Sequence, residues 1–103
     1  MPMNKSDIAY FSHVFKALAD ETRQHILELL RKNGEMSVND IAGHFNLTQP
    51  TISQHLRILK EAEALKNRKD GLRILYRICN IELYDAMETF MQTYEKETKR
   101  KHL

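Results

Sequence analysis

The sequence predicts a mainly helical α+β protein in which four helices, a β-hairpin and a last helix follow one another along the chain. Two observations predict this order. Apolar residues recur every three or four positions in five segments, which is helical spacing, and before the last segment the spacing changes to two beside an Asp-Gly turn. The chain has three Gly and two Pro, which favours helix. Its length of 103 residues predicts a single domain over residues 1–103.

The first two helices are predicted from apolar stripes and from signals at their ends. The first stripe consists of Ile8, Phe11, Phe15 and Leu18. Asp20 is expected to cap the start of the second helix, whose apolar residues are Ile26, Leu27, Leu29 and Leu30. Gly34 follows a basic last turn and is expected to end this helix.

The third and fourth helices are predicted in the same way. Ser37, three residues before Asp40, is expected to start the third helix, whose inward residues are Val38, Ile41, Ala42 and Phe45. Thr48 is expected to cap the fourth helix, with Pro50 in its first turn. The inward residues of this helix are Ile52, Leu56 and Leu59.

Four positions around these two helices have the mutual spacing of a helix-turn-helix motif. Ala42 is small enough to let the helices approach, and Asn46 is expected to adopt the positive φ of the turn. Leu47 is expected to tuck under the turn, and Ile52 to anchor the second helix on the first. One such match is common by chance, whereas four together predict a helix-turn-helix over about residues 37–60.

Residues 65–78 predict a β-hairpin directly after this motif. Asp70-Gly71 is a hairpin turn signal, residues 72–78 alternate as a strand does, and residues 65–69 are the expected partner strand. A hairpin in this position is a wing, so the predicted fold is a winged helix-turn-helix of order α-α-α-α-β-β-α. Helical spacing returns at Leu83, Tyr84, Met87, Phe90, Met91 and Tyr94.

The outward side of the fourth helix carries short and medium hydrogen-bonding side chains. Such side chains bind base edges and phosphates, and the free N–H groups at a helix start suit a phosphate oxygen. We therefore expect this helix to read double-stranded DNA, the alternative being an ordinary solvated surface. The candidate DNA-binding residues on it are Thr48, Gln49, Thr51, Ser53, Gln54, His55 and Arg57.

The predicted wing gathers the positive charge of a chain whose formal net charge is only +2. Its cations are Lys66, Arg68, Lys69, Arg73 and Arg77, with Asp70 opposing them. We expect Arg68, Lys69 and Arg73 to bind flanking phosphates or a minor groove, with an affinity that falls steeply with salt. A solvated pair of charged strands is the alternative.

Three stretches of the chain resemble the ArsR/SmtB repressors. They are residues 17–30, which begin ALADETR and end ILELL, the stretch LTQPTISQHL at 47–56, and the hairpin at 65–78. The resemblance covers residues 8–95, the expected core of the domain. It implies a transcriptional repressor that is a homodimer joined through its first and last helices. Such a two-fold dimer presents two reading helices to a palindromic operator.

The last helix carries more apolar surface than one packing face needs, which agrees with a dimer. A 103-residue winged domain also has little core of its own. The candidate interface residues are Phe11, Phe15, Tyr84, Met87, Met91 and Tyr94. Closing the core of the single protomer is the alternative role for them.

The resemblance raises the question of a metal site, because many of these repressors sense metals. One family site uses two Cys in the third-helix motif ELCVCDL. Here residues 35–41 read EMSVNDI, so Ser37 and Asn39 stand where thiolates are needed. Another family site uses Asp and His of the last helices, and residues 80–101 contain neither His nor Cys. We therefore expect no family-type metal site and no cofactor, with the inducer unknown.

The scattered His and Cys residues leave a sensor with a non-standard site as an alternative. They are His13, His25, His44, His55, His102 and Cys79. His13 and His102 are the pair considered for a metal across a helix interface. Cys79 cannot form a disulfide within the chain and is expected to be an inert thiol, as suits a reducing cytosol.

Two other functional classes fit the sequence less well. An enzyme is not expected, because there is no Gly-rich phosphate loop or paired carboxylate, and Ser53 and His55 face different directions on one helix. A winged-helix adaptor that binds other proteins should have an apolar fourth helix or an acidic wing, and this sequence has neither. No signal peptide and no apolar stretch of the ~20 residues that span a bilayer is found, so a cytoplasmic protein without a membrane partner is expected.

Overall fold

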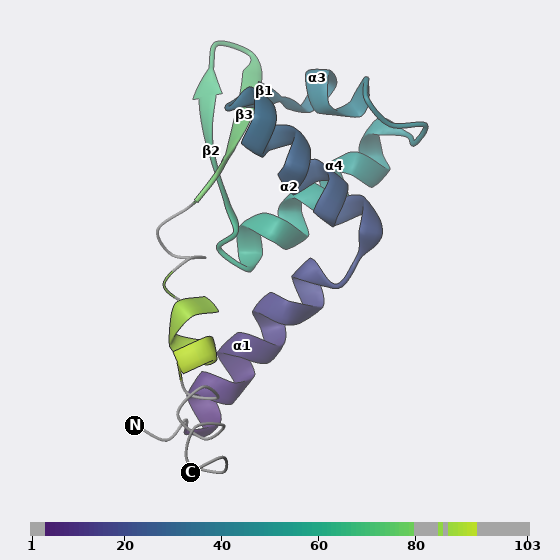
Figure 1. Cartoon of the computed structure of the whole chain (residues 1–103). Coiled ribbons are helices and arrows are strands. Elements are labelled where there is room, and N and C mark those ends of the chain that lie inside the picture. The colour runs from purple at the N-terminus through teal and green to yellow at the C-terminus, as the bar shows by residue number, and fades with distance from the viewer. Residues whose placement is uncertain (1–3, 80–84, 86, 93–103) are drawn as a thin grey trace.

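The computed structural model describes residues 4–79, 85 and 87–92, and Figure 1 shows their arrangement. The elements follow in the order α1 (Lys5–Leu18), α2 (Glu21–Asn33), β1 (Met36–Ser37), α3 (Val38–Ala42), α4 (Gln49–Glu61), β2 (Leu65–Asp70) and β3 (Arg73–Ile78). Residues 87–92 are helical and lie beside the first half of α1 in Figure 1. Of the residues expected in the last helix, Leu83, Tyr84 and Tyr94 fall outside the described part.

The three expected N-caps are confirmed by hydrogen bonds to their side chains. Asp20 accepts one from the backbone N–H of Arg23 at 3.0 Å, and Ser37 Oγ accepts one from that of Asp40 at 3.1 Å. Thr48 Oγ1 caps α4. Each cap satisfies a donor that has no partner within its helix, which fixes where the helix starts.

The hairpin is confirmed, and a third, very short strand joins it. The sheet order is β1-β3-β2, with β3 antiparallel to both neighbours. Gly71 lies in the two-residue turn with φ 65°, a conformation that glycine adopts without strain. The two-residue strand β1 was not expected, and because it runs directly into α3 it ties the helix-turn-helix to the wing.

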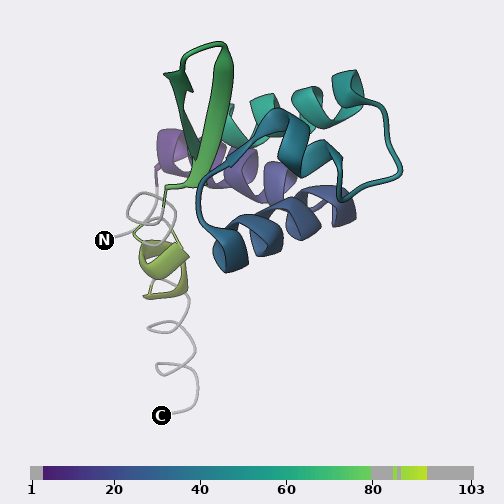
Figure 2. The same ribbon diagram turned by 90° about the horizontal axis from the view of Figure 1, so that it is seen from above.

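The core lies where α2, α3, α4 and the base of the wing meet, as Figure 2 shows from above. Ile26, Ile41, Ile52, Leu56 and Leu59 are fully buried there, as the predicted inward stripes require. A second contact joins α1 to the helical residues 87–92, where the ring centroid of Phe90 lies 5.4 Å from that of Phe11 and 4.6 Å from that of Phe15. The expected helical stripes therefore form two packing regions.

The turn of the helix-turn-helix differs from the sequence-based expectation. The helix α3 ends at Ala42, and Phe45 lies beyond it while still packing on the core. His44 N–H donates to the carbonyl of Ile41, so the chain leaves the helix through a tight right-handed turn. Asn46 therefore has no need of a positive φ, and it does not adopt one. Leu47 is 43% exposed instead of tucked under the turn.

A positive φ occurs instead at the end of α4. Glu63 has φ 65°, the single non-glycine residue in this region of φ among those described. The N–H of Ala64 donates to the carbonyl of Leu59, and that of Glu63 to the carbonyl of Lys60. This is the Schellman pattern of helix termination, which requires a left-handed residue after the cap. It turns the chain from α4 into β2.

Candidate DNA-binding surface

The helix α4 has a buried side and an exposed polar side. Ile52, Leu56 and Leu59 are fully buried, which fixes the rotation of the helix about its axis. Most of the predicted reading residues are consequently exposed: Thr48, Gln49, Thr51, Ser53, Gln54 and Arg57. The rotation expected from the sequence is therefore correct for these six residues.

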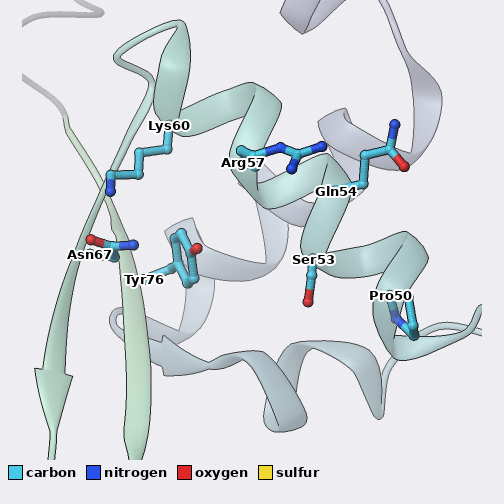
Figure 3. A pocket seen from close by; sticks show the side chains of 7 residues that line it. All are labelled: Pro50, Ser53, Gln54, Arg57, Lys60, Asn67 and Tyr76. Carbon is cyan, nitrogen blue, oxygen red and sulfur yellow. The ribbon is translucent and has the colours of Figure 1, made fainter.

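A groove of about 470 Å³ separates this polar side from the wing, and Figure 3 shows the side chains along it. Ser53, Gln54 and Arg57, three of the candidate DNA-binding residues, line it from α4. Lys60 extends from the last turn of α4 toward the strands. The full lining is Pro50, Ser53, Gln54, Arg57, Lys60, Asn67 and Tyr76. The groove thus offers amide, hydroxyl, guanidinium and ammonium groups together, which are the groups that bind bases and phosphates.

Four residues of this groove were not among the sequence-based candidates. Lys60 continues the row of Ser53 and Arg57 at helical spacing, so the period of α4 would have identified it. Asn67 and Tyr76 are directly paired across β2 and β3. No signal in the sequence places these two beside α4, because that depends on how the wing docks on the helix.

The reading side chains have no partners within the described part of the protein. Gln49, Ser53, Gln54 and Arg57 form no side-chain hydrogen bond or ion pair with described residues. Among the exposed reading residues the exceptions are at the helix start, where the hydroxyl oxygens of Thr48 and Thr51 lie 2.9 Å apart. A polar group without an internal partner is free to bind another molecule without first breaking an intramolecular bond.

Two of the three arginines of the wing, Arg68 and Arg73, are held by carboxylates instead. Arg68 donates from Nε and Nη2 to the two oxygens of Glu35, at 2.9 and 2.7 Å. Arg73 donates to Asp70 at 3.2 Å. The hydrogen bonds from Arg68 hold the pKa of Glu35 below its ordinary value and raise the pKa of Arg68. Lys69 is exposed and forms no such pair with described residues.

A smaller hollow of about 270 Å³ lies between the turn of the wing and the starts of α3 and α4. Gln49 and Ser53 line it from α4, and Arg73 lines it from the wing. The other lining residues are Ser37, Val38, Asn39, Leu72 and Ile74. Ser53 lines both hollows, so the polar surface is continuous from the groove to the wing turn.

His55 does not share this surface. Its side chain is 18% exposed, and its Nδ1 lies 3.2 Å from Nη1 of Arg23 and 3.9 Å from Oδ2 of Asp20. It therefore lies on the side of α4 that faces α2, which differs from the sequence-based expectation. The physical reason is helical geometry, since His55 is three residues after Ile52 and four before Leu59, both buried, and residues at these spacings share one side of a helix.

The expected interface residues divide into three groups. Phe11 is buried and Phe15 half-buried, both against Phe90 of the same chain. Met87 is half-buried and Met91 is 58% exposed. Tyr84 and Tyr94 lie outside the described residues. Met91 is thus the candidate that presents most apolar surface outward.

The two positions at which the family's metal motif has cysteines are occupied here by Ser37 and Asn39, and the structure places them differently. Ser37 is buried and its hydroxyl caps α3, while Asn39 is exposed. Cys79 is a buried thiol. Within the described residues, no three His, Cys, Asp or Glu side chains come together as metal ligands would. His102 is outside the described part.

Three comparisons with known proteins agree on one family. Residues 20–65 match the family of bacterial regulatory proteins described as the arsR family. The transcriptional repressor SdpR of Bacillus subtilis is 42% identical over 85 residues, which are 82% of this chain and 93% of that protein. The arsenical resistance operon repressor of Escherichia coli is 45% identical over 65 residues, 63% of this chain and 56% of that protein.

A solved structure resembles the fold closely. It is the homodimeric winged helix-turn-helix DNA-binding domain of a Mycobacterium bovis protein, with a TM-score of 0.70 and 28% identity over 90% of this chain and 85% of that one. The predicted winged helix-turn-helix is confirmed by this similarity. Within the described residues, no helix combines the length and the apolar character needed to cross a membrane.

Proposed function

The chain belongs to the arsR family of bacterial regulatory proteins and is a DNA-binding transcriptional regulator, and on this premise we propose that it is a homodimeric repressor of a palindromic operator. In this proposal α4 lies in the major groove of each half-site. The wing lies along the flanking backbone and minor groove. A protein that binds chromosomal DNA in this way is expected in the cytoplasm.

One observation carries the proposal: the polar row of α4 is exposed and has no internal partners in the described structure. Gln49, Ser53, Gln54 and Arg57 are available to base edges, where Gln pairs with adenine and Arg with guanine. At the start of α4, Pro50 has no N–H and the N–H of Thr51 donates to Thr48 Oγ1, so the N–H of Gln49 is the first-turn donor that suits a phosphate oxygen. We assign Gln54 and Arg57 to base contacts, and Thr48 and Thr51 to the backbone.

The wing contributes charge more than sequence reading in this proposal. Lys69 on the wing and Lys60 at the end of α4 beside it are unpaired within the described structure and are assigned to phosphates. Arg68 and Arg73 would have to exchange Glu35 and Asp70 for phosphate before they bind DNA. Each phosphate neutralised releases counterions, so the affinity should fall steeply with salt.

The dimer is proposed to form through α1 and the terminal helix, of which residues 87–92 are described. Ile8 on α1 and Met91 on the terminal helix are 54% and 58% exposed, a large fraction for apolar side chains. The M. bovis relative of the same fold is homodimeric. Phe15, Met87 and Met91 are the described residues assigned to this interface, with Phe11 supporting it from inside the protomer.

The signal that releases the DNA is proposed to be neither arsenite nor another soft metal bound in the third helix. Ser37 has a hydroxyl in place of a thiol, and this hydroxyl accepts the hydrogen bond that starts α3. A hard hydroxyl already used as a helix cap is a poor ligand for a soft metal. Titration calorimetry with arsenite, zinc and nickel tests this, and sub-micromolar binding that weakens the DNA complex would contradict it.

The experiment that tests the main proposal is a selection of duplexes from a random library by the purified protein. The selected sequence should be palindromic, and fluorescence anisotropy should show tighter binding to it than to a scrambled duplex. Sedimentation analysis should show a dimer on one duplex. If the protein retains no duplex even at low salt, it is a protein-binding adaptor of the same fold and the proposal is wrong.

A further inference from the structure

Arg23 connects three helices through one guanidinium group. Its Nε donates to the carbonyl of Ala17 and its Nη2 to the carbonyl of Lys16 at 3.2 Å, so it bonds to two carbonyls in the last turn of α1. Its Nη1 lies 3.2 Å from Nδ1 of His55 on α4. Arg23 itself belongs to the first turn of α2. The side chain of Arg23 therefore links α2, to which it belongs, to both α1 and α4.

The pairing with Arg23 determines which form of His55 is present. A guanidinium has only donors, so Nδ1 of His55 must be the acceptor of this hydrogen bond. The imidazole is then neutral, with its proton on Nε2. Oδ2 of Asp20 lies 3.9 Å from the same Nδ1 and accepts a hydrogen bond from the backbone N–H of Arg23. Arg23, Asp20 and His55 thus form one local network.

We propose that His55 is a positioning residue, which acts through Arg23 to join the recognition helix α4 to the end of α1. The inference rests on the proposed function, in which α4 reads DNA and α1 belongs to the dimer interface. Through this link, α4 keeps a fixed angle to α1, and so the two recognition helices of a dimer keep a fixed spacing. His55 itself does not contact DNA.

The burial of the network supports this role. The side chain of His55 is 18% exposed, whereas Ser53, Gln54 and Arg57 on the polar side of α4 are exposed. The hydrogen bond from the backbone N–H of Arg23 and the charge of its guanidinium hold the pKa of Asp20 below its ordinary value, so the carboxylate stays charged beside the guanidinium. Hydrogen bonds to a charged group are stronger than neutral ones, and a network of several bonds holds its members in one arrangement.

A double-mutant cycle on the full-length dimer tests the proposal. His55→Phe removes the acceptor, and Arg23→Lys keeps the charge while losing the fork that reaches three acceptors. Each variant should weaken binding to the selected duplex by about fivefold to tenfold. Because both variants break the same link, the double variant should bind no more weakly than the worse single one. His55→Asn, which can place an amide oxygen near the position of Nδ1, should restore most of the affinity.

Two results would overturn the proposal. If the losses of the two single variants multiply in the double variant, His55 acts on DNA independently of Arg23. If His55→Phe changes only the melting temperature and leaves the affinity unchanged well below it, the residue is merely structural. Sedimentation of each variant checks that the dimer persists.

A measurement on the free dimer separates this inference from the proposed function. In the ¹⁵N NMR spectrum of the unbound protein, the imidazole of His55 should show its proton on Nε2. Arg23→Lys should shift the amide resonances along α4 as well as those near Ala17. Both results are expected even if the wild type binds no duplex, in which case the proposed function fails and the link stands. An Nδ1-protonated His55, or α4 resonances that do not respond, would refute the link itself.

Discussion

The polar side of α4 and the wing both face the proposed DNA, but they differ in how their charged and polar groups are held. On α4, Gln49, Ser53, Gln54 and Arg57 have no partner among the described residues. On the wing, Arg68 is bound by both oxygens of Glu35 and Arg73 by Asp70. The side chains of the helix can therefore bind another molecule at no cost in internal bonds, whereas Arg68 and Arg73 of the wing must first give up a carboxylate.

This difference predicts that α4 reads the DNA sequence, whereas the wing mainly supplies positive charge. Free side chains on a helix whose inner residues are fully buried are held in place by the helix, as specific reading requires. Arg68 and Arg73 bring positive charge to the strands of the wing. Because each is paired with a carboxylate, neither is committed to one geometry on DNA. The four predictions that follow test this division, starting with the variant that should have the largest effect.

The first prediction concerns the polar side of α4. Gln54→Ala together with Arg57→Ala should weaken binding to the selected duplex about 100-fold or more, because each good base contact is worth ~1–3 kcal/mol. Binding to scrambled DNA should change much less, so selectivity is lost. Fluorescence anisotropy with both duplexes measures this. Arg31→Ala, an exposed cation on α2, is the charge-matched control, and an equal loss in that variant would refute the assignment.

The second prediction compares two double variants that remove the same charge. Lys60→Ala with Lys69→Ala removes unpaired cations, whereas Arg68→Ala with Arg73→Ala removes paired ones. The lysine variant should lower the slope of log affinity against log salt by about two. The arginine variant should lower it by less. Anisotropy titrations at four salt concentrations decide between them, and a larger change for the arginine variant would reverse the comparison.

The third prediction is a gain of affinity. Glu35→Gln frees Arg68 and removes a negative charge beside the wing, so binding to any duplex should tighten by about twofold to threefold at low salt. Glu21→Gln, at an exposed position on α2, changes the net charge equally and should have a smaller effect. Weaker binding by Glu35→Gln would mean that the pair with Arg68 is needed to hold the wing in place.

The smallest effect concerns stability against pH. The pKa of Glu35 in the folded protein lies below the ordinary value of 4.5, because Arg68 donates hydrogen bonds to its charged form. The stability from this pair is therefore complete above that ordinary pKa and is lost as the pH falls through the lower pKa of the folded state. The difference in melting temperature between wild type and Glu35→Gln should be constant from pH 7 to about 5.5 and shrink below about pH 4. A difference that grows on acidification would contradict the assignment.

Local chemistry made the helices and the hairpin predictable. Asp20, Ser37 and Thr48 each stand one residue before a helix and accept the expected hydrogen bond, and Gly71 lies in the expected turn. These signals depend on a few neighbouring residues, so they can be read from the chain alone. The outward row of α4 followed from the same periodicity.

Contacts between distant segments could not be predicted in this way. Glu35 and Arg68 are 33 residues apart, and Arg23 and His55 are 32 apart. From the sequence alone, Arg68 and His55 are polar residues within the elements expected to bind DNA, and the partners that each has in the fold cannot be foreseen. The strand β1 has two residues, too few for any alternation to be visible. The expectations of a positive φ at Asn46 and of a buried Leu47 are wrong, because the path of the chain after α3 depends on the packing of Phe45 on the core.

The separation of reading residues from folding residues on α4 has a consequence for how such proteins diverge. Gln49, Ser53, Gln54 and Arg57 contribute no internal hydrogen bond or ion pair in the described structure, so replacing them should leave folding nearly unchanged. A duplicated gene could thus acquire a new target site by changes at a handful of positions, with its regulatory partners and assembly retained. Selection on specificity and selection on stability would then act on different residues of the same helix.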